Sequence, residues 1–192
     1  YAREEINSIG DYYAYGKELI DKKDVFDFDV TKLCVYTKKI GLTGIEVYDL
    51  LRDEYDIQME FGDIGNIMAY ISIGDRLQDI ERLVGALEDI KRLYAKDASS
   101  LAYVDAVIPE VVYSPQYSFY AKKRSLPIGE TDGCVAGESV MCYPPGIPIL
   151  APGELITADI IEYIKYAKEK GCQMTGTEDI NIKKLNVLKE DI

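Results

Sequence analysis

The first hundred residues alternate between helical and strand-like hydrophobic patterns, and this alternation limits the possible folds more than any other feature. Apolar side chains recur every three or four residues from Leu77 to Ile90, as on one face of a helix. The run from Asn66 to Ile73 is apolar on both faces and predicts an internal strand. The other predicted elements are a helix, turn and short strand in residues 1–21, strands at 32–37 and 57–60, and a helix from Thr43 to about Tyr55. Together they predict an α+β fold in which helices cover one sheet.

Helix starts are marked by capping sequences. Thr43-Gly44-Ile45-Glu46 and Asp75-Arg76-Leu77-Gln78 both read as capping boxes, and the second should begin a helix that ends near Tyr94. In the second half, Ser114-Pro115 predicts a short helix, and Thr157 predicts a last helix closed by Gly171. Strands broken by glycines are expected in residues 130–143, with a final strand near 185–188.

Composition excludes several classes of function. The chain has 192 residues and no histidine, which removes Ser–His and Cys–His nucleophile systems, histidine bases and histidine metal ligands. Its four cysteines form no Cys-x-x-Cys pair, so we expect reduced thiols in a cytoplasmic protein and no metal site. The net charge of −12 repels nucleic acid. No apolar run approaches the roughly 20 residues that span a bilayer.

The chain is expected to contain two domains. Residues 95–105 read as a linker between the first α+β pattern and a second unit. The first residues, Tyr1 to Glu5, read as the middle of a helix and not as a secretory leader. We therefore expect a piece of a longer protein.

A proline-rich string from Tyr143 to Glu154, YPPGIPILAPGE, is the most distinctive sequence in the chain. It could be a rigid crossover between strands or a PxxP ligand. Its apolar flanks and the capped helix after it favour a folded, partly buried loop. Glu154 is interpreted as a negative charge near the N-terminus of that helix.

The longer string from Gly137 to Glu154 resembles the C-terminal domain of bacterial ornithine/lysine/arginine decarboxylases, whose pattern is YPPG-[IV]-P-x-x-x-PGE. Ser114 to Ala121 is similar to the family's SPREAFFA helix. The segment from Gly41 to Gly74 is similar to its aspartate-aminotransferase-like small domain. The resemblance implies residues 1–97 as that small domain, and residues 106–192 as the appended α/β C-terminal domain.

The same resemblance implies a lyase that uses pyridoxal phosphate to decarboxylate arginine, lysine or ornithine, giving a polyamine or its precursor. In the family the cofactor lysine follows a histidine, and this chain has none. We therefore assign no catalytic and no cofactor-binding residue to this chain, and expect it to be inactive by itself. The resemblance also implies a homodimer or larger homo-oligomer, in which this region packs against its own large domain and a second subunit.

Glu60 is the single residue to which we assign a role from the resemblance. A family glutamate at the matching position contacts the distal cation of the substrate at the mouth of the active site. A fixed carboxylate beside an ammonium or guanidinium group forms a charge-assisted hydrogen bond. Without the resemblance, a surface glutamate on an edge strand is the simpler interpretation. Asp63 lies close enough in sequence to form a carboxylate pair with it.

A non-enzymatic module is the alternative to a piece of a decarboxylase. Such a module would bind basic amino acids or polyamines, or would regulate the enzyme. If the chain is a piece of the enzyme, its isolated form should expose apolar surface on the first helix and around Tyr113–Tyr120, and should associate through it.

Overall fold

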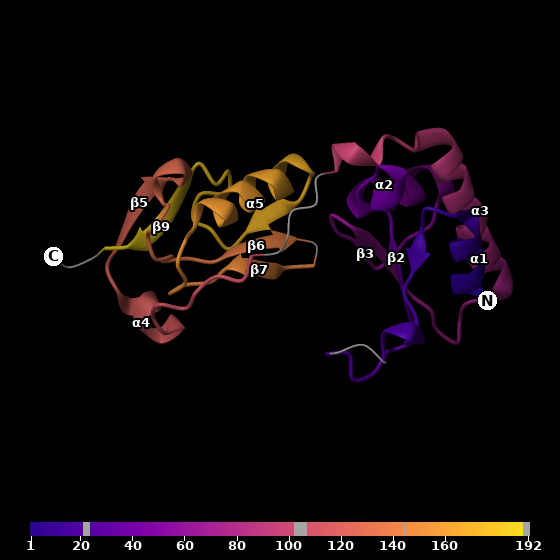
Figure 1. The fold of residues 1–192 in the computed structure, drawn as a ribbon, viewed down its shortest axis with the longest axis horizontal. Helices are drawn as coiled ribbons and strands as arrows, with labels where there is room; N and C mark the ends of the chain where they lie inside the picture. Colours follow the sequence, from indigo (N-terminus) through magenta and orange to yellow (C-terminus); the bar gives the residue numbers. More distant parts are fainter. Residues whose placement is uncertain (21–23, 102–106, 144, 190–192) are drawn as a thin grey trace. The chain divides into compact units, whose positions relative to one another are not determined.

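The computed structural model describes residues 1–20, 24–101, 107–143 and 145–189. The chain divides into two compact units, Tyr1–Ala102 and Tyr103–Ile192. The first unit is indigo to magenta in Figure 1, and the second runs from pink through orange to yellow. Both combine sheets and helices, so the predicted α+β class is confirmed.

The first unit is built around a four-stranded antiparallel sheet in the order β1-β2-β4-β3. Its strands are β1 (Tyr13–Ala14), β2 (Lys32–Tyr36), β3 (Phe61–Gly62) and β4 (Asn66–Tyr70). Its helices are α1 (Ala2–Ile9), α2 (Gly44–Tyr55) and α3 (Leu77–Tyr94), with short 3-10 turns at Lys17–Leu19, Lys38–Ile40 and Ala98–Ser100.

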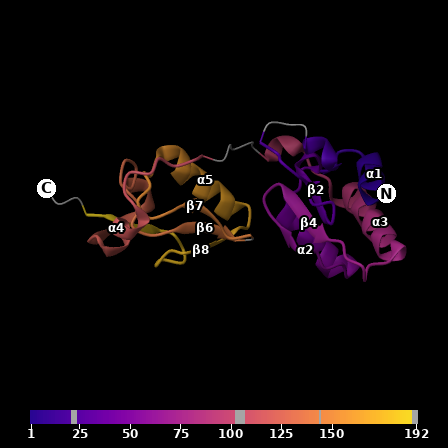
Figure 2. The same cartoon turned by 90° about the horizontal axis from the view of Figure 1, so that it is seen from below.

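The core of this unit lies between the sheet and its helices. Every second residue of β2 and β4 is buried, and Leu33, Val35 and Ile67 are fully buried. These side chains belong to one apolar cluster with residues from α1, α2 and α3. The helices therefore cover one face of the sheet, as Figure 2 shows for β2, β4 and the three helices. The strand period of two selects this face.

Capping explains where the helices begin. The Thr43 hydroxyl accepts the Glu46 N–H at 3.1 Å, and the Glu46 carboxylate accepts the Thr43 N–H at 2.8 Å, so the first predicted capping box is confirmed. The second capping box was predicted at Asp75–Gln78, one residue before its position in the structure, Arg76–Asp79. The Asp79 carboxylate accepts the Arg76 N–H at 3.0 Å, while Asp75 accepts the Ser72 N–H in the preceding turn.

The strand predicted at 57–60 is wrong. Helix α2 ends at Tyr55, and the next residue, Asp56, has a left-handed φ of 52° that turns the chain sharply. Residues 57–60 lead back to the sheet, and ladder pairing begins only when the Glu60 N–H donates to the Met68 carbonyl at 2.8 Å. The strand itself is Phe61–Gly62. The internal strand is confirmed but ends at Tyr70, because residues 72–75 form a turn.

The second unit contains two small antiparallel sheets, β7-β6-β8 and β5-β9. Its strands are β5 (Lys123–Pro127), β6 (Val140–Tyr143), β7 (Ile147–Leu150), β8 (Gln173–Thr175) and β9 (Lys184–Leu188). Its helices are α4 (Pro115–Tyr120) and α5 (Ala158–Glu169), with a 3-10 turn at Ile128–Glu130. Fully or almost fully buried side chains from the strands and α5 form its core, among them Val140, Leu150, Ile160, Ile164 and Leu185. The helices predicted after Ser114 and Thr157 are confirmed.

The proline-rich string folds as a hairpin and the turn after it. It begins at the last residue of β6 and contains all of β7, which pairs with β6, so it is neither a crossover nor a free PxxP ligand; Pro144 lies outside the described residues. The Glu154 carboxylate accepts the Ala151 N–H at 2.6 Å and closes the turn Ala151–Glu154. Closing this turn is a role that the sequence did not suggest, and the predicted effect of the Glu154 charge on the helix that begins after Thr157 stays a prediction.

Gly153 joins this turn to the start of α4. Its carbonyl accepts the N–H groups of Val112 and Tyr113 at 2.9 and 3.0 Å. Its φ is +96°, and a Cβ there would lie 2.2 Å from the Tyr113 carbonyl oxygen and 2.8 Å from the Ser118 hydroxyl. Only glycine satisfies both the left-handed backbone and this close approach.

Gly153→Ala should destabilise the second unit by about 2–4 kcal/mol, because it adds backbone strain and a steric clash. Gly129→Ala is the matched control, since a Cβ there meets open space. Urea unfolding of the two variants measures the difference. Equal midpoints would show that the Gly153 contact can relax without cost.

Candidate functional site

Glu60 lies immediately before edge strand β3. Met59 before it is buried, whereas the Glu60 side chain is exposed. Its backbone is held by the hydrogen bond to Met68, but its carboxylate makes no hydrogen bond or ion pair with the described residues. The result is a carboxylate on a fixed backbone with its hydrogen-bonding capacity available.

Asp63 does not pair with Glu60, because its carboxylate stabilises its own turn. One oxygen accepts the N–H groups of Gly65 and Asn66, each at 2.7 Å, and the Asn66 side-chain amide at 3.2 Å. The Asp63 N–H donates to the Asn66 carbonyl at 2.8 Å. These bonds close the turn between β3 and β4, which fixes the register of both strands.

This turn is also fastened to helix α2. The Asp63 carbonyl accepts the Ile45 N–H at 3.0 Å, which satisfies a donor in the first turn of the helix. A Cβ on Gly44 would lie 1.9 Å from the Asn66 carbonyl oxygen, and one on Gly62 would lie 2.4 Å from the Gly44 carbonyl oxygen. The chain at β3 therefore has little freedom to move relative to α2.

The sheet face opposite the helices carries polar and aromatic side chains. The Lys32 ammonium lies 3.9 Å from the centre of the Tyr70 ring, a cation–π contact between paired positions of β2 and β4. Burial, together with the nearby charge of Asp63, raises the pKa of the Cys34 thiol to about 11. Burial lowers the pKa of Lys38, an effect that Asp63 partly offsets. Cys34 is thus a protonated thiol at neutral pH and not an activated nucleophile.

A hollow of about 200 Å³ lies between residues 56–59, the end of β4 and the start of α3, and Glu60 is not among the residues that line it. The chain from Asp56 to Met59 forms one wall, and Ala69 to Ile71 forms another. Its carboxylates are mostly engaged: Asp75 and Asp79 accept backbone N–H groups.

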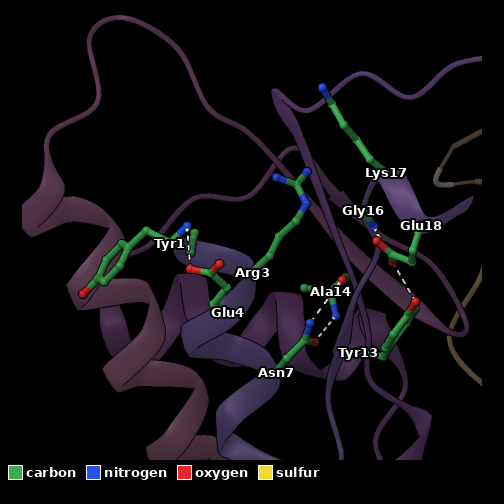
Figure 3. Close-up of a pocket in the computed structure, with 10 residues that line it drawn as sticks. Tyr1, Arg3, Glu4, Asn7, Tyr13, Ala14, Gly16, Lys17 and Glu18 are labelled. Atoms are coloured by element: carbon green, nitrogen blue, oxygen red, sulfur yellow. Dashed lines mark hydrogen bonds and ion pairs between the residues drawn. The ribbon is translucent and has the colours of Figure 1, made fainter. Parts of the chain in front are cut away.

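A larger pocket of about 440 Å³ lies between the start of α1 and strand β1 (Figure 3). Several of its polar groups are already partnered within the unit. Arg3 donates to the Tyr15 carbonyl at 2.6 Å and to the Lys32 carbonyl at 2.9 Å, and Glu18 accepts the Tyr13 hydroxyl at 2.7 Å. Asn7 hydrogen-bonds Ala14 across the pocket, as Figure 3 shows. These bonds fix α1 to the sheet, so the pocket has a structural explanation.

The start of helix α2 does not fit the phosphate of pyridoxal phosphate. Binding that cofactor requires a lysine, a phosphate cradle and an acidic partner for the ring. The glycine-containing start of α2 cannot cradle a phosphate, because the Asp63–Asn66 turn occupies the space in front of Gly44. Within the same residues, no group of three or more potential metal ligands is found. Nor does any helix there combine the length and apolar character needed to cross a membrane.

Comparison with known proteins identifies the class. Residues 97–181 match the family described as Orn/Lys/Arg decarboxylase, C-terminal domain. The chain is 36% identical to an arginine decarboxylase of Bacillus anthracis over 98% of its own length, and 35% identical to one of Bacillus subtilis. It spans about two fifths of the length of these relatives, 39% in each case. This chain therefore corresponds to the C-terminal region of an Orn/Lys/Arg decarboxylase.

Solved structures show the same fold. A lysine decarboxylase of Francisella novicida aligns with a TM-score of 0.72 at 17% identity, covering 98% of this chain and 38% of the other. The constitutive lysine decarboxylase of E. coli aligns with a TM-score of 0.64 at the same identity. At this identity the likeness describes the fold of both units and not their substrates.

Sequence reasoning missed how the site is supported. The sequence Asp63-Ile64-Gly65-Asn66 contains turn-forming residues, which could have placed the hairpin between β3 and β4. The contact of that turn with α2 joins residues about twenty positions apart, and no local pattern encodes it.

Asp63→Ala should lower the free energy of unfolding by about 1–3 kcal/mol, because three donors lose their acceptor. Asp63→Asn retains one acceptor oxygen and should lose about half as much. Urea denaturation followed by tyrosine fluorescence measures both. If both variants were as stable as the wild type, the Asp63 turn would not hold β3 in place.

Proposed function

We propose that this chain is the substrate-recognition side of a pyridoxal-phosphate-dependent decarboxylase of a basic amino acid, with Glu60 contacting the distal cation of the substrate. The observation that carries the proposal is an unpaired, exposed carboxylate on a fixed backbone. It occurs in a chain related over 98% of its length to arginine decarboxylases.

The chemistry of Glu60 suits this role. A guanidinium or ammonium group forms a charge-assisted hydrogen bond with a carboxylate. A neutral side chain would leave the carboxylate unpaired in the closed complex, which costs binding energy and excludes such substrates. The turn and glycine contacts around Asp63 hold the backbone of β3, so little entropy is lost when the substrate binds.

Arginine is the proposed substrate. Relatives that align with nearly the whole chain are named arginine decarboxylases, whereas a lysine decarboxylase of Pseudomonas aeruginosa aligns with 37% of it at 31% identity. The product would be a polyamine precursor, formed in the cytoplasm by a homo-oligomer. In this proposal residues 1–97 form an aminotransferase-like small domain and 106–192 the appended domain.

The chemistry of decarboxylation is placed outside these residues. Pyridoxal phosphate supplies the electron sink in this enzyme class. Its lysine and phosphate cradle would belong to polypeptide that this chain does not contain. The contribution proposed for the chain is binding and orientation of the cationic end of the substrate.

Glu60→Gln in the complete decarboxylase should lower kcat/KM for arginine by about 2–4 kcal/mol, because a buried cation loses its charged partner. The penalty should vanish for citrulline, a neutral analogue of similar shape. Glu81→Gln, an exposed glutamate on α3, is the matched control. Steady-state carbon dioxide release by the wild type and the two variants, with arginine and with citrulline, measures these differences.

A change of less than twofold for arginine would make Glu60 a surface residue and remove the site assignment. The decarboxylase assignment would survive that result. Absence of decarboxylation by the complete protein would instead favour a non-enzymatic binding module.

A further inference from the structure

Gln58 and Glu60 lie on the same side of the segment that leads into strand β3. Both side chains are exposed, whereas Met59 between them is 3% exposed and belongs to the core of the first unit. This alternation is typical of extended backbone, in which successive side chains point to opposite sides. The carboxylate proposed to bind the substrate therefore has the Gln58 amide beside it.

The Gln58 amide has a defined orientation. Its nitrogen donates to the Tyr48 hydroxyl at 2.5 Å and to the Met59 carbonyl at 3.0 Å. A carbonyl oxygen can only accept, so the atom that faces Met59 is the amide nitrogen. The side-chain oxygen of Gln58 is directed elsewhere, and no donor among the described residues reaches it. Gln58 thus presents a neutral acceptor next to the Glu60 carboxylate.

Tyr48 of helix α2 holds this amide in place. Its hydroxyl accepts the bond from Gln58, and its Cβ lies so close to Gly62 that a Cβ on that glycine would be 2.8 Å away. The Tyr48 side chain therefore contacts the chain on both sides of Glu60. The ladder with β4 holds the chain after Glu60, and the bond to Tyr48 holds it before.

A guanidinium group matches this pair of acceptors better than an ammonium group does. A guanidinium carries five N–H donors on three nitrogens in one plane, so it can donate to two acceptors that lie on different sides of it. An ammonium group directs all of its donors from a single nitrogen. Each donor left without an acceptor in a closed complex costs binding energy. A neutral acceptor beside the carboxylate therefore benefits arginine more than lysine or ornithine.

We propose that Gln58 is a second substrate-binding residue, whose side-chain oxygen accepts an N–H of the arginine guanidinium while Glu60 supplies the opposite charge. Tyr48 is a positioning residue in this arrangement and acts on the substrate only through Gln58. The inference rests on the decarboxylase function and the Glu60 site proposed above. It adds the residues that select arginine from the other basic amino acids.

Gln58→Met tests the acceptor, because methionine has nearly the same shape and offers no oxygen. In the complete decarboxylase it should lower kcat/KM for arginine about tenfold or more, the range for a lost hydrogen bond to a charged group. The inhibition constant of lysine, measured as a competitor of arginine, should change less than about threefold. Gln78→Met, at an exposed glutamine on α3, is the matched control and should change neither value.

Tyr48→Phe tests the positioning role, because it removes the hydroxyl and keeps the ring. It should lower kcat/KM for arginine about threefold or more. In the double variant it should add less than about twofold to the effect of Gln58→Met, since Tyr48 acts through Gln58. Tyr94→Phe removes a hydroxyl that donates to Glu54 instead, and should leave arginine use unchanged. Circular dichroism melting checks that every variant is folded.

Equal losses for arginine and lysine in Gln58→Met, or no loss for either, would overturn this inference. Glu60→Gln would still decide the proposed site in that case. Fully additive effects of Tyr48→Phe and Gln58→Met would overturn the positioning role. A complete wild-type protein that releases no carbon dioxide from arginine would remove the proposed function and this inference together, so wild-type activity distinguishes the two failures.

Discussion

The first unit depends on one tight junction, where the turn closed by Asp63 meets the start of helix α2. Gly44 and Gly62 allow backbone atoms to approach too closely for any side chain to intervene. The Asp63 carboxylate satisfies the turn, and its carbonyl satisfies the helix. The hydrogen bond that joins the turn to the helix runs from the Ile45 N–H to the Asp63 carbonyl, and because both are backbone groups, side-chain rotation does not break it. The position of β3, and with it Glu60, follows from this constraint.

The second unit uses the same principle at a different place. The turn Ala151–Glu154 is closed by its own carboxylate, and Gly153 brings that turn against the backbone before α4. In both units a glycine and an acidic side chain create a rigid backbone contact, and a surface group is presented from it. In the first unit that group is a single carboxylate, and in the second it is a set of aromatic side chains. A recognition role fits both arrangements better than acid–base catalysis, which would require groups poised to exchange protons.

Local patterns in the sequence were sufficient for the long elements. The 3–4 spacing after Leu77 and the capping box at Thr43 encode α3 and α2 within a few residues of chain. Strand β3 could not be placed, because its two residues become a strand only by pairing with β4. The hairpin of β6 and β7 was missed for a related reason: the prolines suggested a folded, partly buried loop, whereas pairing between the two strands decides the fold. Glu60 was selected by resemblance, and sequence could not show whether its carboxylate would be left unpaired.

The central claim is that this chain recognises a cationic substrate while the cofactor is held by other polypeptide. A titration of the folded 192-residue chain with pyridoxal phosphate, read in the visible spectrum and followed by dialysis and peptide mapping, tests it most directly. The decisive observation is whether one lysine is modified selectively. The account predicts weak, unselective modification that dialysis removes. A stoichiometric band that survives dialysis and maps to a single lysine would contradict it.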